Sequence, residues 1–137
     1  MEKVTPPARV AAALGLGDDA VVLRIRRLRL ADAEPIGLHT LYVPFPLAEQ
    51  VRPDFMEQGD SSLWYLEDSL GLTLSESHRV IEAVPARPDE ARWLEVKTGA
   101  PLLLIRRTTI AADGAPVEYL HSVYRGDRFE YYVHLEH

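Results

Sequence analysis

Cysteine is absent from the 137 residues of this chain. The sequence therefore excludes disulfide bonds, thiolate metal sites and cysteine nucleophiles, and it suits a reducing compartment. Long apolar runs are absent as well, because none approaches the roughly 20 residues that a membrane-spanning helix needs. The start of the chain, MEKVTPPARV, also lacks the apolar stretch of a signal peptide. We therefore expect a cytoplasmic protein without membrane contact.

An excess of basic residues is also lacking. The net charge is -6 and the isoelectric point is near 5.3, whereas binding to nucleic-acid phosphates requires a dense basic face. We therefore expect no DNA or RNA binding by these residues on their own. Residues 135–137, Leu-Glu-His, are expected to be the remnant of an affinity tag and carry no functional argument.

The length and composition indicate a single soluble domain over residues 1–137. A chain of this length can bury roughly two-thirds of its unfolded surface, which is enough for a hydrophobic core. Hydrophobic residues make up 47% of the sequence and charged residues 26%, as in ordinary globular proteins. No internal repeat and no low-complexity linker is evident.

Cap, turn and alternation signals predict a succession of short helices and strands. Helices are predicted in TPPARVAAALGLG, GDSSLWYLEDSLGL and RPDEARWLEV, with a short helix or irregular connector in FPLAEQVRPDFME. Strands are predicted over residues 20–30, in IGLHTLYVP and TLSESHRVIEAVPA, on both sides of the Asp113-Gly114 turn, and after a further turn at residues 125–127. Strands joined by tight turns are antiparallel. The sequence therefore predicts an α+β domain, an antiparallel sheet of about six strands with flanking helices.

Arginines are concentrated in the first predicted strand, RIRRLR, of this acidic chain. Side chains alternate between the two faces of a strand, so Arg27 and Arg29 continue the face that begins with Leu23 and Ile25. Two guanidinium groups about 7 Å apart at the end of a core-facing row suit a phosphate or a carboxylate. The alternative is a charged, solvated face that protects an edge strand from aggregation.

A second mixed row lies on the predicted strand PVEYLHSVYR. Glu118, Ser122 and Tyr124 share one face of this strand with Leu120, and His121 falls on the other face. A carboxylate, a hydroxyl and a phenol on one face can bind the hydroxyl groups of a polar ligand. Polar strand residues also commonly face water, which is the alternative for this row.

Motifs spread along almost the whole chain carry a family resemblance. The most specific are RLR (27–29) followed by a turn and Pro35, DGAPVE (113–118) and SVYRGDRF (122–129). With these motifs the chain resembles the UTRA domain, the effector-binding domain of bacterial GntR-type transcriptional regulators of the HutC subfamily. The resemblance implies a chorismate-lyase-like fold and a ligand sensor with no catalytic residues, no cofactor and no metal.

The resemblance also implies roles for particular residues. In family members that sense sugar phosphates, an Arg-x-Arg pair and a serine at a helix N-terminus hold the phosphate, while a glutamate and a tyrosine six residues later hold the sugar. A helix N-terminus also attracts anions in its own right. Carried over, the ligand-binding residues are Arg27, Arg29, Ser61 or Ser62, Glu118 and Tyr124.

One position departs from the family pattern. His39 stands ten residues after Arg29, where the family often has glutamate. A glutamate only accepts hydrogen bonds when ionised, whereas a histidine can donate or accept them and titrates near neutral pH. We therefore include His39 among the ligand-binding residues and expect a more anionic or differently substituted effector. The alternative is that His39 packs under the sheet.

The expected partners also follow from the resemblance. In the family this domain follows an N-terminal winged helix-turn-helix, which is missing from these residues. We expect a small anionic effector such as a sugar phosphate, a homodimer, and DNA binding through that missing domain. The dimer interface is expected on an exposed strand, either residues 102–110 or the last strand.

Two alternative functions remain. One is a chorismate-lyase-like enzyme, with Glu118 as general acid or base and His39 or His121 as its helper. The other is a dimerisation domain that binds no ligand.

Overall fold

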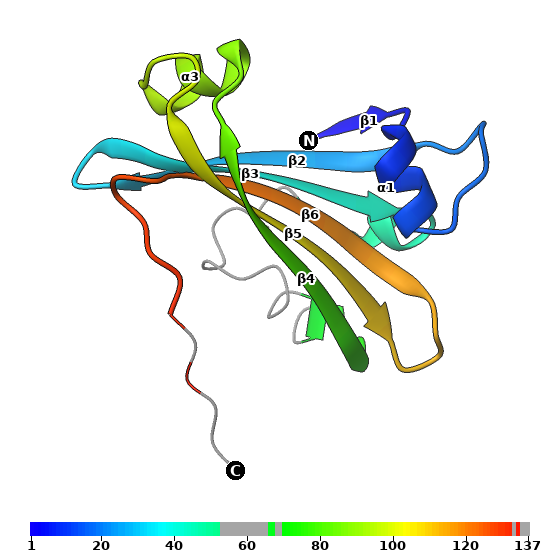
Figure 1. The fold of residues 1–137 in the computed structure, drawn as a ribbon. Helices are drawn as coiled ribbons and strands as arrows, with labels where there is room; N and C mark the ends of the chain where they lie inside the picture. Colours follow the sequence, from blue (N-terminus) through cyan, green and yellow to red (C-terminus); the bar gives the residue numbers. More distant parts are fainter. Residues whose placement is uncertain (53–65, 68–69, 133, 135–137) are drawn as a thin grey trace.

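The computed structural model describes residues 1–52, 66–67, 70–132 and 134. Within these residues the chain forms a six-stranded antiparallel sheet with the strand order β1-β2-β3-β6-β5-β4 (Figure 1). The strands are β1 (Glu2–Val4), β2 (Val22–Ala31), β3 (Glu34–Pro44), β4 (Leu74–Pro85), β5 (Pro101–Ala111) and β6 (Pro116–Arg125). The helices are α1 (Ala8–Ala13), α3 (Pro88–Leu94) and the short 3-10 helix η1 (Leu47–Gln50). The predicted α+β class is confirmed.

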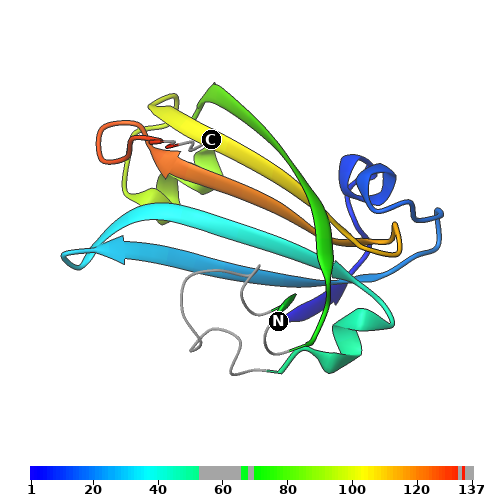
Figure 2. The same ribbon diagram turned by 90° about the horizontal axis from the view of Figure 1, so that it is seen from below.

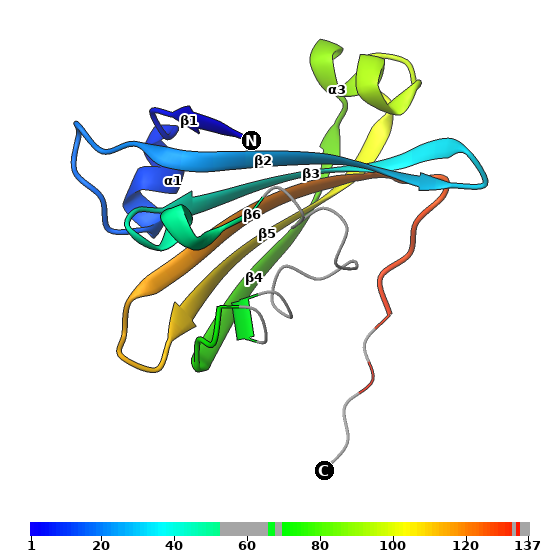
Figure 3. The ribbon, with the colours of Figure 1, turned by 180° about the vertical axis from the view of Figure 1, so that it is seen from behind.

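The two faces of the sheet are covered by different elements (Figures 1 and 3). We call the face that α1 and α3 cover the helix face, and the opposite one the η1 face. On the helix face, one buried cluster under α1 contains Val10, Leu14, Val22, Tyr42 and Tyr119, and another under α3 contains Leu38, Ala91, Leu94, Leu102, Leu104 and Val123. On the η1 face, the buried cluster contains Leu23, Ile25, Leu41, Val43, Ala48 and Leu120.

Helix and turn signals in the sequence mark these elements correctly. α1 and α3 fall inside two of the predicted helical segments, and η1 inside the predicted connector. Asp32 and Ala33 have φ angles of 52° and 66°, the conformation of a tight hairpin turn between β2 and β3. Gly114 has a φ angle of 89° in the turn between β5 and β6, where glycine avoids strain. No helix in the described ranges has the length and apolar character that crossing a membrane requires.

The fold contains an internal repeat. The order β1-α1-β2-β3 is followed by β4-α3-β5-β6. α1, β2 and β3 begin at residues 8, 22 and 34, and α3, β5 and β6 begin at residues 88, 101 and 116, roughly 80 residues later in each case. β3 and β6, the last strands of the two halves, pair at the centre of the sheet (Figure 2). The sequence shows no evident repeat, so this repetition appears only in the fold. Few residues coincide between the halves, the clearest being Ile-Arg-Arg at 25–27 and at 105–107.

The predicted last strand is wrong for the described part of the tail, because residues 128–132 form no strand. Both edges of β6 are already occupied by β3 and β5, so the chain that follows has no place beside it. The tail instead makes side-chain contacts. The Phe129 ring stacks on Tyr124, and the Tyr131 hydroxyl accepts a hydrogen bond from Arg79 at 2.9 Å.

The sixth strand is β1, which the sequence did not predict. It pairs with β2 at the other end of the sheet. A segment of three residues is too short to show the alternation on which strand prediction depends. The predicted helix in GDSSLWYLEDSLGL lies mostly outside the described residues.

Candidate functional site

The strand register brings the two rows of candidate residues together on the η1 face. Directly paired residues in an antiparallel sheet point to the same face. Two cross-strand rows result, Arg27–His39–Ser122 and Arg29–Gly37–Tyr124, each running from β2 through β3 to β6. Five candidates from segments far apart in the sequence, Arg27, Arg29, His39, Glu118 and Tyr124, therefore share one face.

The arginine pair stands where the alternation of β2 places it. The β-bulge of β2 comes after Arg29, so the alternation holds from Leu23 to Arg29. Leu23 and Ile25 are buried, and the two arginines that follow on the same face are half-buried. A fully solvated row would leave both guanidinium groups exposed, as Arg26 is on the helix face. Arg27 and Arg29 are therefore less exposed than their neighbour Arg26 on the other face.

His39 is hydrogen-bonded to Tyr124, another candidate residue. Its Nε2 lies 2.6 Å from the Tyr124 hydroxyl, and the two rings meet edge to face with centroids 5.3 Å apart. His39 is half-buried and stands between Arg27 and Ser122 in the sheet. It does more than pack under the sheet, because it holds the phenol of Tyr124 in place.

Tyr124 lies in a partly buried position between rings and cations. Its ring is stacked on Phe129 with centroids 3.9 Å apart. Burial raises the pKa of Tyr124 above its ordinary value, although a hydrogen bond with the Ser122 side chain and the nearby charges of Arg29, Arg107 and Arg79 act in the opposite direction. The phenol is therefore neutral at physiological pH and can donate or accept a hydrogen bond.

Glu118 is held by two residues of β5. Its side chain is fully buried. Its Oε1 accepts hydrogen bonds from Arg107 Nε and from Thr109 Oγ1, both at 2.9 Å. Arg107 and Thr109 were missed in the sequence, although the alternation of RRTTI places both on one face of a strand next to the one that carries Glu118. Their contacts fix the orientation of the carboxylate.

Ser122 is a buried hydroxyl close to Tyr124. Its hydroxyl oxygen is buried, and the residue is 1% exposed. Its interaction with the Tyr124 phenol is weak in geometry, but it is close enough to lower the pKa of that phenol. Ser122 lies next to His39 in the sheet, within the same group of polar side chains.

His121 lies on the opposite face of the sheet from Glu118. It lines adjoining cavities on the helix face, the larger two of about 220 and 340 Å³, together with Arg87. Burial lowers the pKa of His121, which Arg87 and Arg9 lower further and Glu90 raises. A role for His121 as helper to a catalytic Glu118 is therefore wrong, because the sheet separates the two side chains.

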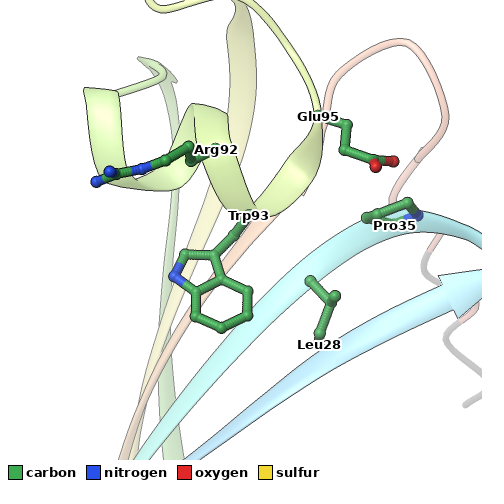
Figure 4. A pocket seen from close by; sticks show the side chains of 5 residues that line it. All are labelled: Leu28, Pro35, Arg92, Trp93 and Glu95. Carbon is green, nitrogen blue, oxygen red and sulfur yellow. The ribbon is translucent and has the colours of Figure 1, made fainter.

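A separate cavity of about 420 Å³ lies between α3 and the β2–β3 hairpin. Its lining residues are Leu28, Pro35, Arg92, Trp93 and Glu95. Figure 4 shows the indole of Trp93 projecting from α3 toward Leu28, with Pro35 at the hairpin. None of the predicted ligand-binding residues lines this cavity.

The two serines that were predicted at a helix N-terminus, Ser61 and Ser62, lie outside the described residues. Across the described ranges, no group of three or more histidine, aspartate or glutamate side chains is placed to hold a metal ion.

Comparison with known proteins decides the family. The UTRA domain matches residues 1–130 of this chain. The chain belongs to the UTRA domain family. Its fold agrees, because a solved transcriptional regulator of the GntR family from Enterococcus faecalis V583 superposes with a TM-score of 0.86 at 30% identity, covering 98% of this chain and 95% of that one. PhnF from Mycobacterium smegmatis superposes with a TM-score of 0.79 at 26% identity, covering 98% of this chain and 59% of that one.

The curated relatives of this UTRA domain are transcriptional regulators. The HTH-type transcriptional repressor NagR of Bacillus subtilis is 33% identical over 128 residues, which are 93% of this chain and 51% of the repressor. The histidine utilization repressor of Pseudomonas putida is 30% identical over 119 residues, 86% of this chain and 46% of that protein. The chain thus spans about half the length of the curated relatives that it matches.

Proposed function

We propose that this UTRA domain is the effector sensor of a GntR-type transcriptional regulator and binds a small anionic metabolite, such as a sugar phosphate, on the η1 face. The bound effector changes the DNA affinity of a separate winged helix-turn-helix domain, and no chemical reaction occurs. Relatives in this family are repressors, one of them named for histidine utilization. Such a role requires a sensor for a small metabolite rather than an enzyme.

The observation that carries the proposal is the convergence of cations and oriented polar groups on one face. Arg27 and Arg29 are half-buried there, and their guanidinium groups suit an anion because each offers a planar set of donors. Across β3, the phenol of Tyr124 and the buried hydroxyl of Ser122 provide further polar contacts. Glu118, oriented by Arg107 and Thr109, suits hydroxyl groups of the same ligand.

The proposed mechanism is a shift between two conformations of the regulator. An effector shifts such an equilibrium only as far as its affinity differs between the two states. The anion bridges Arg27 and Arg29 on β2 to groups on β3 and β6, so its contacts depend on the relative positions of these strands. The effector therefore favours the conformation in which the side chains on β2, β3 and β6 contact it at the same time.

A thermal-shift screen against sugar phosphates, amino-sugar phosphates and carboxylates such as urocanate tests the proposal. A ligand at a hundred times its dissociation constant adds about 2.7 kcal/mol to stability, a shift of several degrees. A charge-assisted hydrogen bond contributes about 1.5–3 kcal/mol, so Arg29→Ala is expected to weaken binding at least about tenfold.

Arg26→Ala is the matched control, because Arg26 is on the same strand but on the helix face and exposed. It is expected to leave ligand binding unchanged. A ligand whose affinity is the same in Arg29→Ala and in the unaltered protein would contradict the assignment of the site. Binding of uncharged metabolites in preference to every anion tested would contradict the proposed effector class.

A further inference from the structure

The helix face carries a cavity with a cationic lining. This cavity of about 220 Å³ is bordered by residues of α1 and by Arg87, the residue that precedes α3. Its lining contains three arginines, Arg9, Arg26 and Arg87, and no aspartate or glutamate among the described residues. The whole chain has a net charge of -6. A cavity bordered by three cations and by no acid therefore attracts anions on an otherwise acidic protein.

The floor of this cavity is formed by the two central strands of the sheet. Thr40 of β3 pairs directly with His121 of β6, and both residues line the cavity. Thr40 is buried and His121 is half-buried. β3 and β6 are the last strands of the two repeats of the fold. A hydroxyl and an imidazole therefore lie at the junction of the two halves, below the arginines.

An apolar cavity of about 340 Å³ adjoins the cationic one and shares Arg87 and His121 with it. Its other lining residues are Val84, Pro85, Glu90, Leu104 and Val123. Glu90, the one acid among them, lies beside Arg87, with its Oε1 3.5 Å from Nε of that arginine. The two volumes together fall within the range of about 300–1,000 Å³ that small-molecule sites occupy.

We propose that the two adjoining cavities form a second ligand site, which binds a small carboxylate with an apolar body. The carboxylate lies among Arg9, Arg26 and Arg87, because planar guanidinium groups bind carboxylates through paired hydrogen bonds. The apolar body lies in the adjoining cavity, where its surface is removed from water. Thr40 and His121 offer further polar contacts between the two parts.

The sheet separates this second site from the proposed effector site. Thr40 and His121 are the immediate neighbours of His39 and Ser122 along β3 and β6, and these two cross-strand pairs point to opposite faces. The two sites therefore use the same strands but different side chains. The second site does not depend on the identity of the effector that binds the η1 face.

His121 makes binding at the second site sensitive to pH. Burial, with the charges of Arg87 and Arg9, lowers the pKa of His121 in the free protein, and Glu90 opposes this in part. A carboxylate bound beside the ring favours the imidazolium and raises this pKa. The ligand itself stays ionised, because carboxyl groups titrate near about 4. The complex therefore takes up a proton, and the affinity increases as the pH falls from about 7.5 to about 5.5. The charged groups that line the cavities with His121 or pair with it are Arg9, Arg26, Arg87, Arg106, Asp89 and Glu90.

Calorimetric titration with phenylacetate, indole-3-acetate and hexanoate tests the ligand class. Each of these probes has one carboxylate on an apolar body. 2-Phenylethanol, in which an uncharged hydroxymethyl group replaces the carboxylate of phenylacetate, is expected to bind at least about tenfold more weakly. Acetate, which lacks the apolar body, is also expected to bind more weakly than phenylacetate. No binding of any of the three probes, or equal affinities for phenylacetate and 2-phenylethanol, would overturn the proposal.

Substitutions on the two faces of the sheet locate the bound phenylacetate. Arg9→Ala is expected to weaken its binding at least about tenfold, and Arg26→Ala is expected to weaken it as well. Arg92→Ala is the matched control, because Arg92 is likewise an exposed helical arginine but lines neither cavity. Arg29→Ala distinguishes the two faces. Loss of phenylacetate binding in Arg29→Ala with full binding in Arg9→Ala would place the ligand on the η1 face and overturn the second site.

NMR titration of the histidine rings provides an independent test of the position. Saturating phenylacetate is expected to raise the pKa of His121 and to leave the signals of His78, which is exposed on β4, unchanged. His121→Gln identifies the His121 signals and is expected to remove the increase in affinity at lower pH. Shifts of the His39 signals without any change at His121 would contradict the proposal, as would the same pH dependence of affinity in His121→Gln and in the unaltered protein.

Discussion

The guanidinium of Arg107 lies 2.8 Å from Oε1 of Glu118, and the carboxylate that it contacts is fully buried. The two residues are on neighbouring strands, β5 and β6, close to the turn that joins them. A buried carboxylate is tolerated only where hydrogen bonds and an opposite charge compensate for the water it has lost. Arg107 and Thr109 together supply that compensation.

Arg107→Ala is therefore expected to lower the free energy of unfolding by about 3–5 kcal/mol, because it leaves a buried charge without its cation. Urea denaturation followed by fluorescence measures the change. Arg125→Ala is the matched control, since its ion pair with Asp127 is at the surface and such pairs contribute about 1 kcal/mol or less. Equal losses in the two variants would show that the Glu118 carboxylate does not depend on Arg107.

Gly37→Ala is expected to disturb the candidate site through Tyr124. A Cβ at position 37 would lie 2.7 and 2.9 Å from two carbon atoms of the Tyr124 ring, so the ring must move and its hydrogen bond to His39 is strained. The expected cost is about 1–3 kcal/mol of stability, together with weaker binding of any ligand found in the screen. Gly17→Ala is the control, because a Cβ there has open space around it. Unchanged stability and binding in Gly37→Ala would contradict this account.

His121 is expected to make the protein sensitive to mild acid. Burial, with the charges of Arg87 and Arg9, lowers the pKa of His121 in the folded state, and Glu90 opposes this only in part. Below the ordinary histidine pKa of about 6.5, the unfolded chain binds a proton that the folded chain does not. The free energy of unfolding therefore falls as the pH decreases through about 6.5 toward the lowered folded pKa.

His121→Gln removes this titration and is expected to flatten the dependence of stability on pH in that range. Chemical denaturation at a series of pH values between about 5 and 7.5 measures it. Parallel curves for the variant and the unaltered protein would show that His121 takes up its proton equally in both states.

Tyr124 and Tyr119 are expected to make the protein sensitive to alkali. Burial raises the pKa of both phenols in the folded state. Above the ordinary tyrosine pKa of about 10, the unfolded chain loses protons that the folded chain keeps, so stability falls as the pH rises. Tyr124→Phe is expected to reduce this fall, as measured by denaturation between about pH 9 and 11.

Tyr132→Phe is the control for the alkaline series, because Tyr132 is 80% exposed and is expected to have no effect. If Tyr124→Phe lost stability with alkali as steeply as the unaltered protein, the phenol of Tyr124 would be exposed to solvent in the folded state.

Local sequence patterns predicted which side chains of the candidate site share a face within one strand. Alternation along β2 placed Arg27 and Arg29 on the face that begins with buried Leu23, and alternation along β6 placed Glu118 on the same face as Tyr124. Both inferences use neighbours within a single strand. The bond between His39 and Tyr124 joins residues 85 positions apart and depends on the register between β3 and β6, which no local pattern contains.

The same limit explains the predictions that were wrong. The segment 102–110, expected as an exposed strand and one of two possible dimer interfaces, is in β5, which is an interior strand with partners on both sides. The tail after Asp127 contains aromatic residues that are typical of a strand. It cannot pair with β6, because β3 and β5 already pair with both sides of that strand. In each case the residue types are typical of a strand, but the position of the segment relative to the sheet decides whether it pairs and whether it is exposed.

The sequence by itself determined the α+β class, most of the strands and helices, the turns between them, and which side chains share a face within each strand. These depend on backbone preferences, caps and alternation, which act between residues close together in the chain. Only the tertiary structure decided the strand order, the repeat of β1-α1-β2-β3, the burial of Glu118 against Arg107 and the exposure of β4. These depend on contacts between strands from both halves of the chain, whose registers arise from the packing of the whole sheet.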